Sequence, residues 1–290
     1  MKEIIVNEKY HNKKLNSFLL DSFPNLAQNT LYKALRQKDI RINDKRIHEN
    51  ITVHTGDKIT VFIADDLLLG KPFHFPIVYE DENILILNKP AGICVTENSH
   101  STETLTTLVK AQFGNSLEPC HRLDCNTTGL ILYAKNEPAL TILLKKFKNR
   151  EIEKHYKATV IGTFSKKHAI LSAYLFKDSK KSLVYISDTP QKNYIKIITE
   201  YTVISENTKN NTSELDVILH TGKTHQIRAH LAHIGHSIIG DGKYGNNQIN
   251  KIFKKSTQML CSSKLKFNFT TESGILEYLN GKEISLYSKS

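Results

Sequence analysis

The densest run of polar side chains in this chain of 290 residues is the loop 121–129, with the sequence HRLDCNTTG. An apolar strand pattern at 130–132 follows directly and places Asp124 at the edge of a core. A carboxylate there can act as a nucleophile or a base when a nearby cation keeps it ionised. An aspartate that only closes a turn through backbone hydrogen bonds is more common, and spacing alone favours that interpretation.

Arg228 is a candidate cation for such a carboxylate. It lies in the segment THQIRAH, residues 224–230, which is expected to form a helix after a turn at 221–223. A guanidinium can form two parallel hydrogen bonds with a carboxylate and stays charged when buried. Most arginines on helices are simply solvated, so the residue type alone leaves both roles open.

Tyr156 begins a segment of alternating pattern that continues with Ala158 and Val160. An aromatic ring at the start of a strand is usually a core residue. Lysines stand on both sides of this one, and a basic helix at 145–150 precedes it, so the ring could equally stack on a nucleic-acid base. The pattern leaves these two roles unresolved.

Four histidines between 225 and 236 raise the question of a metal site, because His230 and His233 could share one face of a helix. Their surroundings are cationic, Asp241 is the nearest acid, and the HExxH arrangement is absent. We therefore expect no metal ion at these histidines.

The cysteines give no sign of a disulfide framework or a zinc site. The four of them form no CxxC pair and stand at positions 94, 120, 125 and 261. We expect reduced thiols.

The elements that must hold these residues divide the chain in two. The segment ADDLLLGKPFHFP, 64–76, loses periodicity and carries two prolines and a glycine, as interdomain linkers do. We predict a small N-terminal module at 1–66, a linker at 67–76 and a second domain at 77–290. In that domain strands alternate with helices of unequal length, which predicts an α+β fold on a mixed, mainly antiparallel sheet flanked by helices.

Charge points to a polyanionic partner. The chain carries 40 Lys and Arg against 29 Asp and Glu, a formal net charge of +11, and such an excess attracts phosphate backbones. In the N-terminal module two short helices lead into a small sheet, and a basic helix face beside a basic hairpin could clamp RNA phosphates. A packing module with solvated cations fits equally well. The candidate RNA contacts are Lys33, Arg36, Lys38, Arg41, Lys45 and Arg46.

The chain resembles known families in two places. The phrases DIRINDKR and TGDKITVFI, at 39–46 and 55–63, resemble the small RNA-binding module of a ribosomal small-subunit protein. The second domain resembles the RluA-type pseudouridine synthases in four segments that follow in the family's order. These are YEDENILILNKPAGI at 79–93, HRLDCNTTGLILYAK at 121–135, EKHYKATVIG at 153–162 and LHTGKTHQIRAHLAHIGHSIIGDGKYG at 219–245.

The resemblance implies cofactor-independent isomerisation of uridine to pseudouridine within RNA. It implies that Asp124 is the catalytic aspartate, that Tyr156 contacts the base, and that Arg228 pairs with the aspartate. Arg122 matches the arginine that occupies the gap left by a flipped nucleotide. The sequence departs from the family pattern at Thr128, Lys223 and Ser237, where serine, arginine and proline are usual.

The appended module favours ribosomal RNA over transfer RNA as the substrate. No apolar run approaches the roughly 18 residues of a membrane span, and no secretory signal is recognisable at the N-terminus, so a cytoplasmic monomer that does not bind membranes is expected. Two alternatives are a non-catalytic RNA-binding protein with a relic second domain, and a metal-dependent RNA hydrolase built on the histidines of 225–236.

Overall fold

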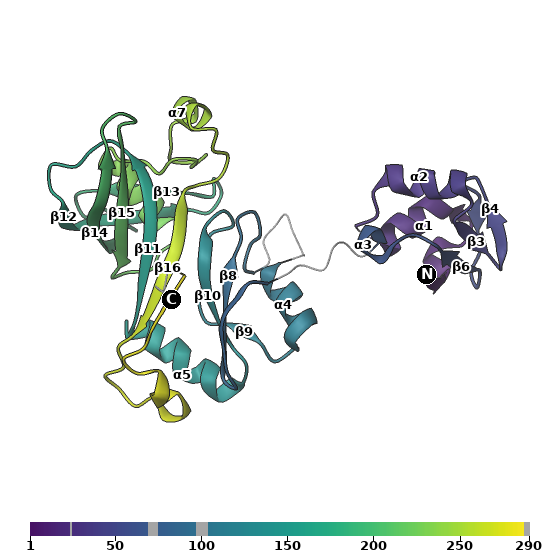
Figure 1. Ribbon diagram of the computed structural model, residues 1–290, viewed down its shortest axis with the longest axis horizontal. Coiled ribbons are helices and arrows are strands. Elements are labelled where there is room, and N and C mark those ends of the chain that lie inside the picture. The colour runs from purple at the N-terminus through teal and green to yellow at the C-terminus, as the bar shows by residue number, and fades with distance from the viewer. Residues whose placement is uncertain (24, 69–74, 97–103, 287–290) are drawn as a thin grey trace. The chain divides into compact units, whose positions relative to one another are not determined.

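The computed structural model describes residues 1–23, 25–68, 75–96 and 104–286 (Figure 1). The chain forms two units, Met1–His74 and Phe75–Ser290, called unit 1 and unit 2 below. None of the helices within these described ranges is long and apolar enough to cross a membrane.

Unit 1 is built on an antiparallel sheet with the strand order β1-β6-β3-β4 and a separate pair, β2-β5. Its elements are β1 (Lys2–Ile5), the 3₁₀ helix η1 (Glu8–Tyr10), β2 (Lys13–Lys14), α1 (Leu15–Ser22), α2 (Gln28–Gln37), β3 (Ile40–Ile42), β4 (Lys45–Ile47), β5 (Thr52–Val53), β6 (Lys58–Val61) and α3 (Asp65–Leu68).

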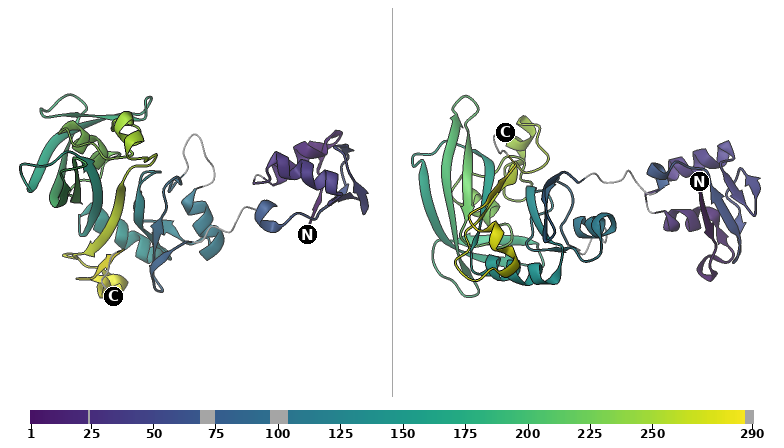
Figure 2. Two further views of the ribbon diagram at one scale, coloured as in Figure 1. Left: turned by 45° about the horizontal axis from the view of Figure 1, so that its top comes forward. Right: turned by 60° about the horizontal axis from the view of Figure 1, so that its bottom comes forward.

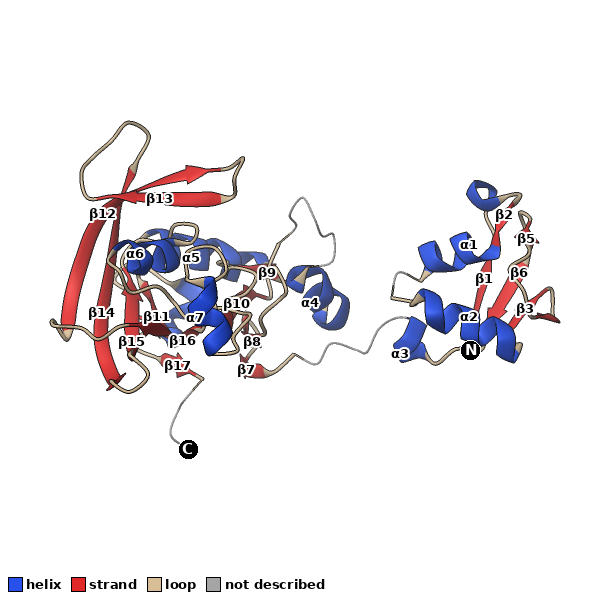
Figure 3. Ribbon diagram, turned by 90° about the horizontal axis from the view of Figure 1, so that it is seen from above, coloured by secondary structure: helices blue, strands red, loops and turns tan. Residues whose placement is uncertain are grey.

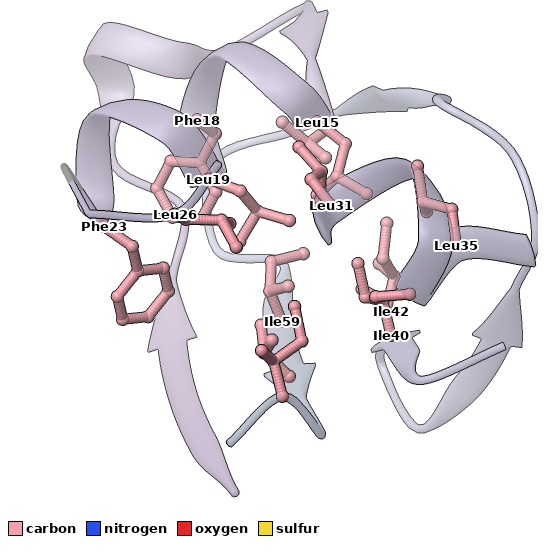
Figure 4. Close-up of a cluster of buried hydrophobic side chains, with 14 of the residues drawn as sticks. Leu15, Phe18, Leu19, Phe23, Leu26, Leu31, Leu35, Ile40, Ile42 and Ile59 are labelled. Atoms are coloured by element: carbon pink, nitrogen blue, oxygen red, sulfur yellow. The ribbon is translucent and has the colours of Figure 1, made fainter. Parts of the chain in front are cut away.

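Apolar side chains from α1, α2 and the sheet meet in the core of unit 1 (Figure 4). Leu15 and Leu19 come from α1, Leu31 and Leu35 from α2, and Ile59 from β6, and all five are buried. Leu31 and Leu35 are four residues apart and so lie on one face of α2. That packing turns the charged face of α2 to solvent.

The hairpin β3–β4 closes through a two-residue turn at Asn43 and Asp44. Both residues have left-handed backbones, with φ of 47° and 68°, which is the geometry that matches the twist of hairpin strands. The Asn43 side chain fixes the turn because its Oδ1 accepts from Lys58 N at 2.9 Å and its Nδ2 donates to Asp57 at 2.8 Å. The turn sets the register that places Arg41 opposite Arg46.

The predicted linker, 67–76, is too long at both ends. Leu67 and Leu68 belong to α3, and Leu68 is buried in the core of unit 1. At the other end, Phe75 is buried in unit 2, with its ring 5.9 Å from that of Phe113. Apolar residues in this stretch pack against the two units, and loss of periodicity alone did not reveal this. The middle of the predicted linker, 69–74, lies outside the described residues.

Unit 2 contains a large mixed sheet whose strands run in the order β13-β12-β14-β15-β11-β16-β10-β8-β7, with β17 on β16 and β9 on β10. Within the described ranges the pair β10–β16 is parallel and the other pairs are antiparallel, which confirms the predicted α+β class. Figure 2 shows the late strand β16, in yellow, inserted between teal strands from the middle of the chain.

The elements of unit 2 are β7 (Ile77–Glu80), β8 (Ile84–Lys89), α4 (Leu105–Phe113), β9 (Glu118–Pro119), β10 (Thr128–Ala134), α5 (Glu137–Lys148), β11 (Ile152–Ile161), β12 (His168–Asp178), β13 (Leu183–Ser187), β14 (Ile195–Asn207), β15 (Thr212–Leu219), α6 (Gln226–His233), α7 (Asn247–Ile252), β16 (Leu260–Phe267), the 3₁₀ helix η2 (Gly274–Leu279) and β17 (Glu283–Ser285).

Two helices cover different parts of this sheet (Figure 3). Helix α5 packs Ala139 and Leu143 into a core with residues of β8, β10 and β16. Helix α6 packs Ala229 into a second cluster with Leu175 of β12 and Val184 of β13. Because α6 is fixed against the sheet, side chains on its first turn have defined positions.

Gly129 allows the parallel contact between β10 and β16. Its φ is +105°, and a Cβ atom built there would lie 2.2 Å from the carbonyl oxygen of Ser262. A residue with a side chain would separate the two strands or strain the backbone. Since Gly129 follows the polar loop 121–128 directly, this close approach also fixes where that loop meets the sheet.

The expectation of reduced thiols was wrong for two of the four cysteines. Cys94 and Cys125 form a disulfide across 31 residues of sequence, whereas Cys120 and Cys261 are free thiols. The spacing gave no signal because the fold, and not a short motif, brings the segment after β8 to the loop that contains Cys125.

Reducing this disulfide should destabilise unit 2. A crosslink closing a loop of this length typically contributes about 2–4 kcal/mol to the free energy of unfolding, so dithiothreitol should lower the melting temperature of the intact chain by roughly 5–15 °C in calorimetry. The Cys94→Ser variant is the control, because it should melt at the lower temperature with or without the reductant. Identical melts of the wild type in both conditions would contradict the expectation.

Candidate active site

A pocket with a volume of about 610 Å³ opens in unit 2. Its size falls within the range typical of sites for small molecules or single nucleotides. The polar loop, the start of β11 and the turn before α6 supply its walls. Polar and charged side chains that line it include those of Arg122, Asp124, Lys154, Tyr156, Lys177, Lys223, His225 and Arg228.

Arg228 joins two carboxylates, of which Asp124 lines this pocket. Its Nε and Nη2 donate to the two oxygens of Asp241 at 2.7 and 2.9 Å, and its Nη1 donates to Oδ2 of Asp124 at 2.8 Å. The Arg228 and Asp241 side chains are buried, whereas 24% of the Asp124 side chain is exposed. The carboxylate of Asp124 is therefore both ion-paired and open to the pocket.

Asp241 holds the guanidinium in place. Its Oδ1 also accepts from the backbone amides of Lys243 and Tyr244, at 2.8 and 3.1 Å. Burial raises the pKa of Asp241, but the hydrogen bonds and charge of Arg228 outweigh burial and leave the pKa below its usual value. Gly240 makes the turn possible, because a Cβ atom there would lie 2.0 Å from the carbonyl oxygen of Thr257.

Tyr156 stands on the pocket wall and is 5% exposed. Strand β11 carries it between Val217 of β15 and Ser262 of β16. Burial, and after it the charge of Asp124, raise the pKa of the phenol. The ring is therefore both a buried residue of the sheet and a neutral phenol at the pocket.

A buried lysine supports the loop that carries Asp124. The ammonium of Lys89, at the end of β8, donates to the carbonyl oxygens of Pro90, Ile93 and Cys125 at 2.9, 2.7 and 2.8 Å. Burial lowers its pKa to about 8, and the charge of Asp124 partly offsets this. The three acceptors match the three N–H bonds of an ammonium group, so Lys89 ties the residue after Asp124 to the end of β8.

Cations dominate the rim and walls of the pocket. Arg122 is exposed, and Lys154, Lys177 and Lys223 also line it, while Asp124 is the acid among the lining residues that the structure describes. Burial lowers the pKa of Lys154. A pocket with this charge balance attracts an anionic ligand such as a nucleotide phosphate.

The histidines of 225–236 separate in the structure. His230 is buried against Thr199, and burial lowers its pKa to about 4. His233 pairs with Asp188, and Nδ1 of His236 lies 2.8 Å from the carbonyl oxygen of Ile161. No cluster of three or more potential metal ligands occurs among the residues that the structure describes.

Residues 83–233 match the family model described as RNA pseudouridylate synthase. The chain belongs to this family. It is 30% identical to the ribosomal large subunit pseudouridine synthase C of Rickettsia bellii over 95% of this chain and 94% of that protein. The protein of the same name from Vibrio cholerae is 30% identical over 84% of this chain and 81% of its own.

The fold agrees with this assignment. The solved structure of human RNA pseudouridylate synthase domain containing 1 superimposes with a TM-score of 0.60 at 24% identity, covering 70% of this chain and 82% of that one. The chain is thus an RNA pseudouridine synthase of the RluA type, and Asp124, Arg228 and Tyr156 meet at its pocket. Arg122 lies at the same pocket, whereas the six basic residues predicted to bind RNA in the N-terminal module belong to unit 1.

Four residues in or beside the pocket were not predicted as site residues from the sequence. They are Asp241, Lys89, His225 and Lys154, and all four lie inside the segments that resemble the family. Their residue types and spacing gave no indication of their contacts. In the sequence, Asp241 stands out only as the acid nearest to the histidines. The signal that could have found it is its position in GDG, a turn between two glycines, where a backbone-bonded carboxylate is common.

Asp241→Asn should disable the synthase and destabilise unit 2. Asparagine has one acceptor oxygen and an NH2 donor in place of the two carboxylate oxygens, so it cannot keep both parallel hydrogen bonds from Nε and Nη2 of Arg228. Removing one partner of a buried ion pair typically costs about 3–5 kcal/mol. Misplacement of Arg228 should slow single-turnover pseudouridine formation roughly 10²-fold. The control is Glu283→Gln, which breaks partly exposed pairs with Lys264 and Lys266 and should cost at most about 1 kcal/mol. Equal melting temperatures for the two variants would show that Asp241 is dispensable for the fold.

Proposed function

We propose that this enzyme isomerises specific uridines of large-subunit ribosomal RNA to pseudouridine, with Asp124 as its catalytic carboxylate. The observation that carries the proposal is an aspartate held by a buried arginine in a cationic pocket. Two relatives that align over most of their length are named for this substrate.

The reaction needs an ionised carboxylate and no external electron or group donor. The bond between ribose C1′ and uracil N1 breaks, the base turns, C5 bonds to C1′, and the C5 proton leaves while N1 gains one. Attack on the sugar, attack on the base and removal of a ribose proton all require Asp124 to be anionic. Arg228 donates a hydrogen bond of 2.8 Å to this carboxylate and places a positive charge beside it.

Tyr156 and Arg122 serve the flipped nucleotide in this proposal. A uracil stacked in a helix must leave the stack before its glycosidic bond is accessible, at a cost of a few kcal/mol. The Tyr156 ring offers a surface on which the extruded base can stack, and its neutral hydroxyl lies near the reacting atoms. Arg122 is exposed beside Asp124, where its guanidinium can fill the gap in the RNA.

Unit 1 is proposed as the second RNA contact. Its six candidate cations make no ion pair with any carboxylate of the described residues, and Arg41 and Arg46 face each other across the hairpin. Like charges in opposite positions destabilise a hairpin unless an anion lies between or above them. Arg41 also stacks on the exposed ring of Phe62 at 4.8 Å, a pairing suited to nucleic acid.

The same proposal extends to partners and compartment. The enzyme acts as a monomer on ribosomal RNA, with transfer RNA as the second choice, and it does not bind membranes. The bacterial relatives named for ribosomal RNA favour a cytoplasmic enzyme. The presence of Asp124, Arg228 and Tyr156 around one pocket favours a catalytic domain over a relic domain. Formation of pseudouridine in the presence of EDTA would exclude the alternative of a metal-dependent hydrolase.

Asp124→Asn should abolish isomerisation while RNA affinity stays close to that of the wild type. The amide keeps the shape of the side chain and removes only the reactive charge. The measurement is carbodiimide primer extension on ribosomal RNA from cells that lack the protein, after incubation with each purified variant. Thermal melting must accompany it, because Arg228 loses one of its two partners.

Asp188→Asn is the matched control, since this carboxylate is exposed and pairs only with His233 among described side chains. It should leave isomerisation unchanged. Pseudouridine formation by folded Asp124→Asn at the wild-type rate would end the assignment of the catalytic aspartate. Failure of the wild type on both ribosomal and transfer RNA would end the proposed function.

Replacing Lys33, Arg36 and Lys38 together by glutamine should weaken binding to a large RNA and flatten its salt dependence. Each lost phosphate contact lowers the slope of log K against log salt by roughly 0.7–0.9, so the triple variant should lose about two units. The control triple carries Lys2→Gln, Lys9→Gln and Lys58→Gln, because these cations of the same unit are already paired with carboxylates. Equal slopes for the two triples would show that unit 1 does not bind RNA through α2.

A further inference from the structure

His225 has an unusual backbone at the edge of the pocket. It precedes α6 with φ +54° and ψ +15°, a left-handed conformation that is unfavourable for a residue with a Cβ atom. Its side chain is 14% exposed and lines the pocket. Strain of this kind persists where surrounding contacts hold the side chain in one position.

A relay of hydrogen bonds provides those contacts. The backbone N–H of Val184 donates to the hydroxyl oxygen of Tyr244 at 2.9 Å, and that oxygen lies 2.8 Å from Nδ1 of His225. The Val184 amide occupies one acceptor site of the Tyr244 hydroxyl, and the hydroxyl hydrogen can point at Nδ1 of His225. An imidazole nitrogen that accepts carries no hydrogen, and with Tyr244 as the donor to Nδ1 we assign the hydrogen of the neutral ring to Nε2.

The charges around the ring keep it neutral. Burial lowers the pKa of His225, the charge of Asp124 opposes this, and the cations of Arg228 and Lys243 lower it further. Asp241 is the remaining acid that acts on the ring, and it is already engaged by Arg228. With this tautomer the Nε2–H group is an uncharged donor.

This donor faces the catalytic carboxylate across a gap. Nε2 lies 3.9 Å from Oδ2 of Asp124, which is too far for a direct hydrogen bond. An oxygen at about 2.8 Å from each atom completes a triangle with normal hydrogen-bond lengths. Because Nε2–H only donates and an ionised carboxylate only accepts, the bridging oxygen must accept one hydrogen bond and donate another, as a hydroxyl does.

A uridine inside an RNA chain has a single hydroxyl, the one at ribose C2′. We infer that His225 binds this 2′-hydroxyl through Nε2–H while the hydroxyl donates to Asp124. The inference rests on the proposed function and adds to it a residue that distinguishes ribose from deoxyribose at the target position. It also places C1′ and C2′ of the sugar beside the catalytic carboxylate.

The test compares two RNAs that differ only by uridine or 2′-deoxyuridine at the target site. Wild-type enzyme should bind the deoxy RNA roughly threefold to tenfold more weakly, the range expected for one hydrogen bond. His225→Ala should bind the uridine RNA more weakly by a similar factor and bind both RNAs equally. His225→Gln, which can place an amide N–H near the position of Nε2, should restore part of the discrimination.

Two further variants separate binding from structure. His233→Ala changes a histidine on the outer part of α6 and should keep the full discrimination. Tyr244→Phe removes the hydroxyl that fixes the His225 ring and should reduce the discrimination between the uridine and 2′-deoxyuridine RNAs. This variant keeps the test possible if His225→Ala fails to fold.

A 2′-deoxy penalty that survives in both folded His225→Ala and Tyr244→Phe would overturn the inference, because a water molecule would then be the better candidate for the bridge. Such a result leaves the proposed function intact as long as the wild type forms pseudouridine in the uridine RNA. Absence of product from the wild type would instead refute the function itself.

Discussion

The arrangement of the pocket depends on how one buried guanidinium is shared between two carboxylates. Arg228 uses two N–H bonds for Asp241 and one for Asp124. With two carboxylates and one guanidinium, the three charged side chains together carry one net negative charge. Asp241 is fully enclosed and receives two backbone amides as well. The uncompensated charge therefore resides mainly on Asp124, the more exposed carboxylate, which is where a reactive anion is needed.

The remaining scaffold fixes the two ends of this interaction independently. On the arginine side, α6 packs against β12 and β13, and the turn at Gly240 presents Asp241. On the aspartate side, Lys89 binds the carbonyl of Cys125, and Gly129 lets β10 approach β16. Residues far apart in sequence are thus positioned accurately enough to form hydrogen bonds. Loops without this support would not hold them as accurately.

The sequence predicted much of the fold, because the strands and helices of unit 2 have clear periodic patterns. It also singled out Asp124, Tyr156 and Arg228 as catalytic residues, but only through resemblance, since each residue taken alone had a commoner structural role. Periodicity and spacing missed contacts over long sequence distances. The pairing of Arg228 with Asp124, 104 residues apart, was predicted only through the resemblance, and the disulfide of Cys94 and Cys125, 31 residues apart, was not predicted. Periodicity carries no information about which distant side chains meet.

The neutrality of His225 follows from the same charge balance. A protonated imidazole 3.9 Å from Asp124 would add a second positive charge beside the two carboxylates. The net negative charge that makes Asp124 reactive would then be lost. Burial beside Arg228 and Lys243 disfavours that protonation. A neutral N–H donor can orient a hydroxyl without competing for the anion. In the mechanism that we propose two tasks are therefore separate, since Arg228 is the cationic partner of Asp124 and His225 supplies a directed hydrogen bond.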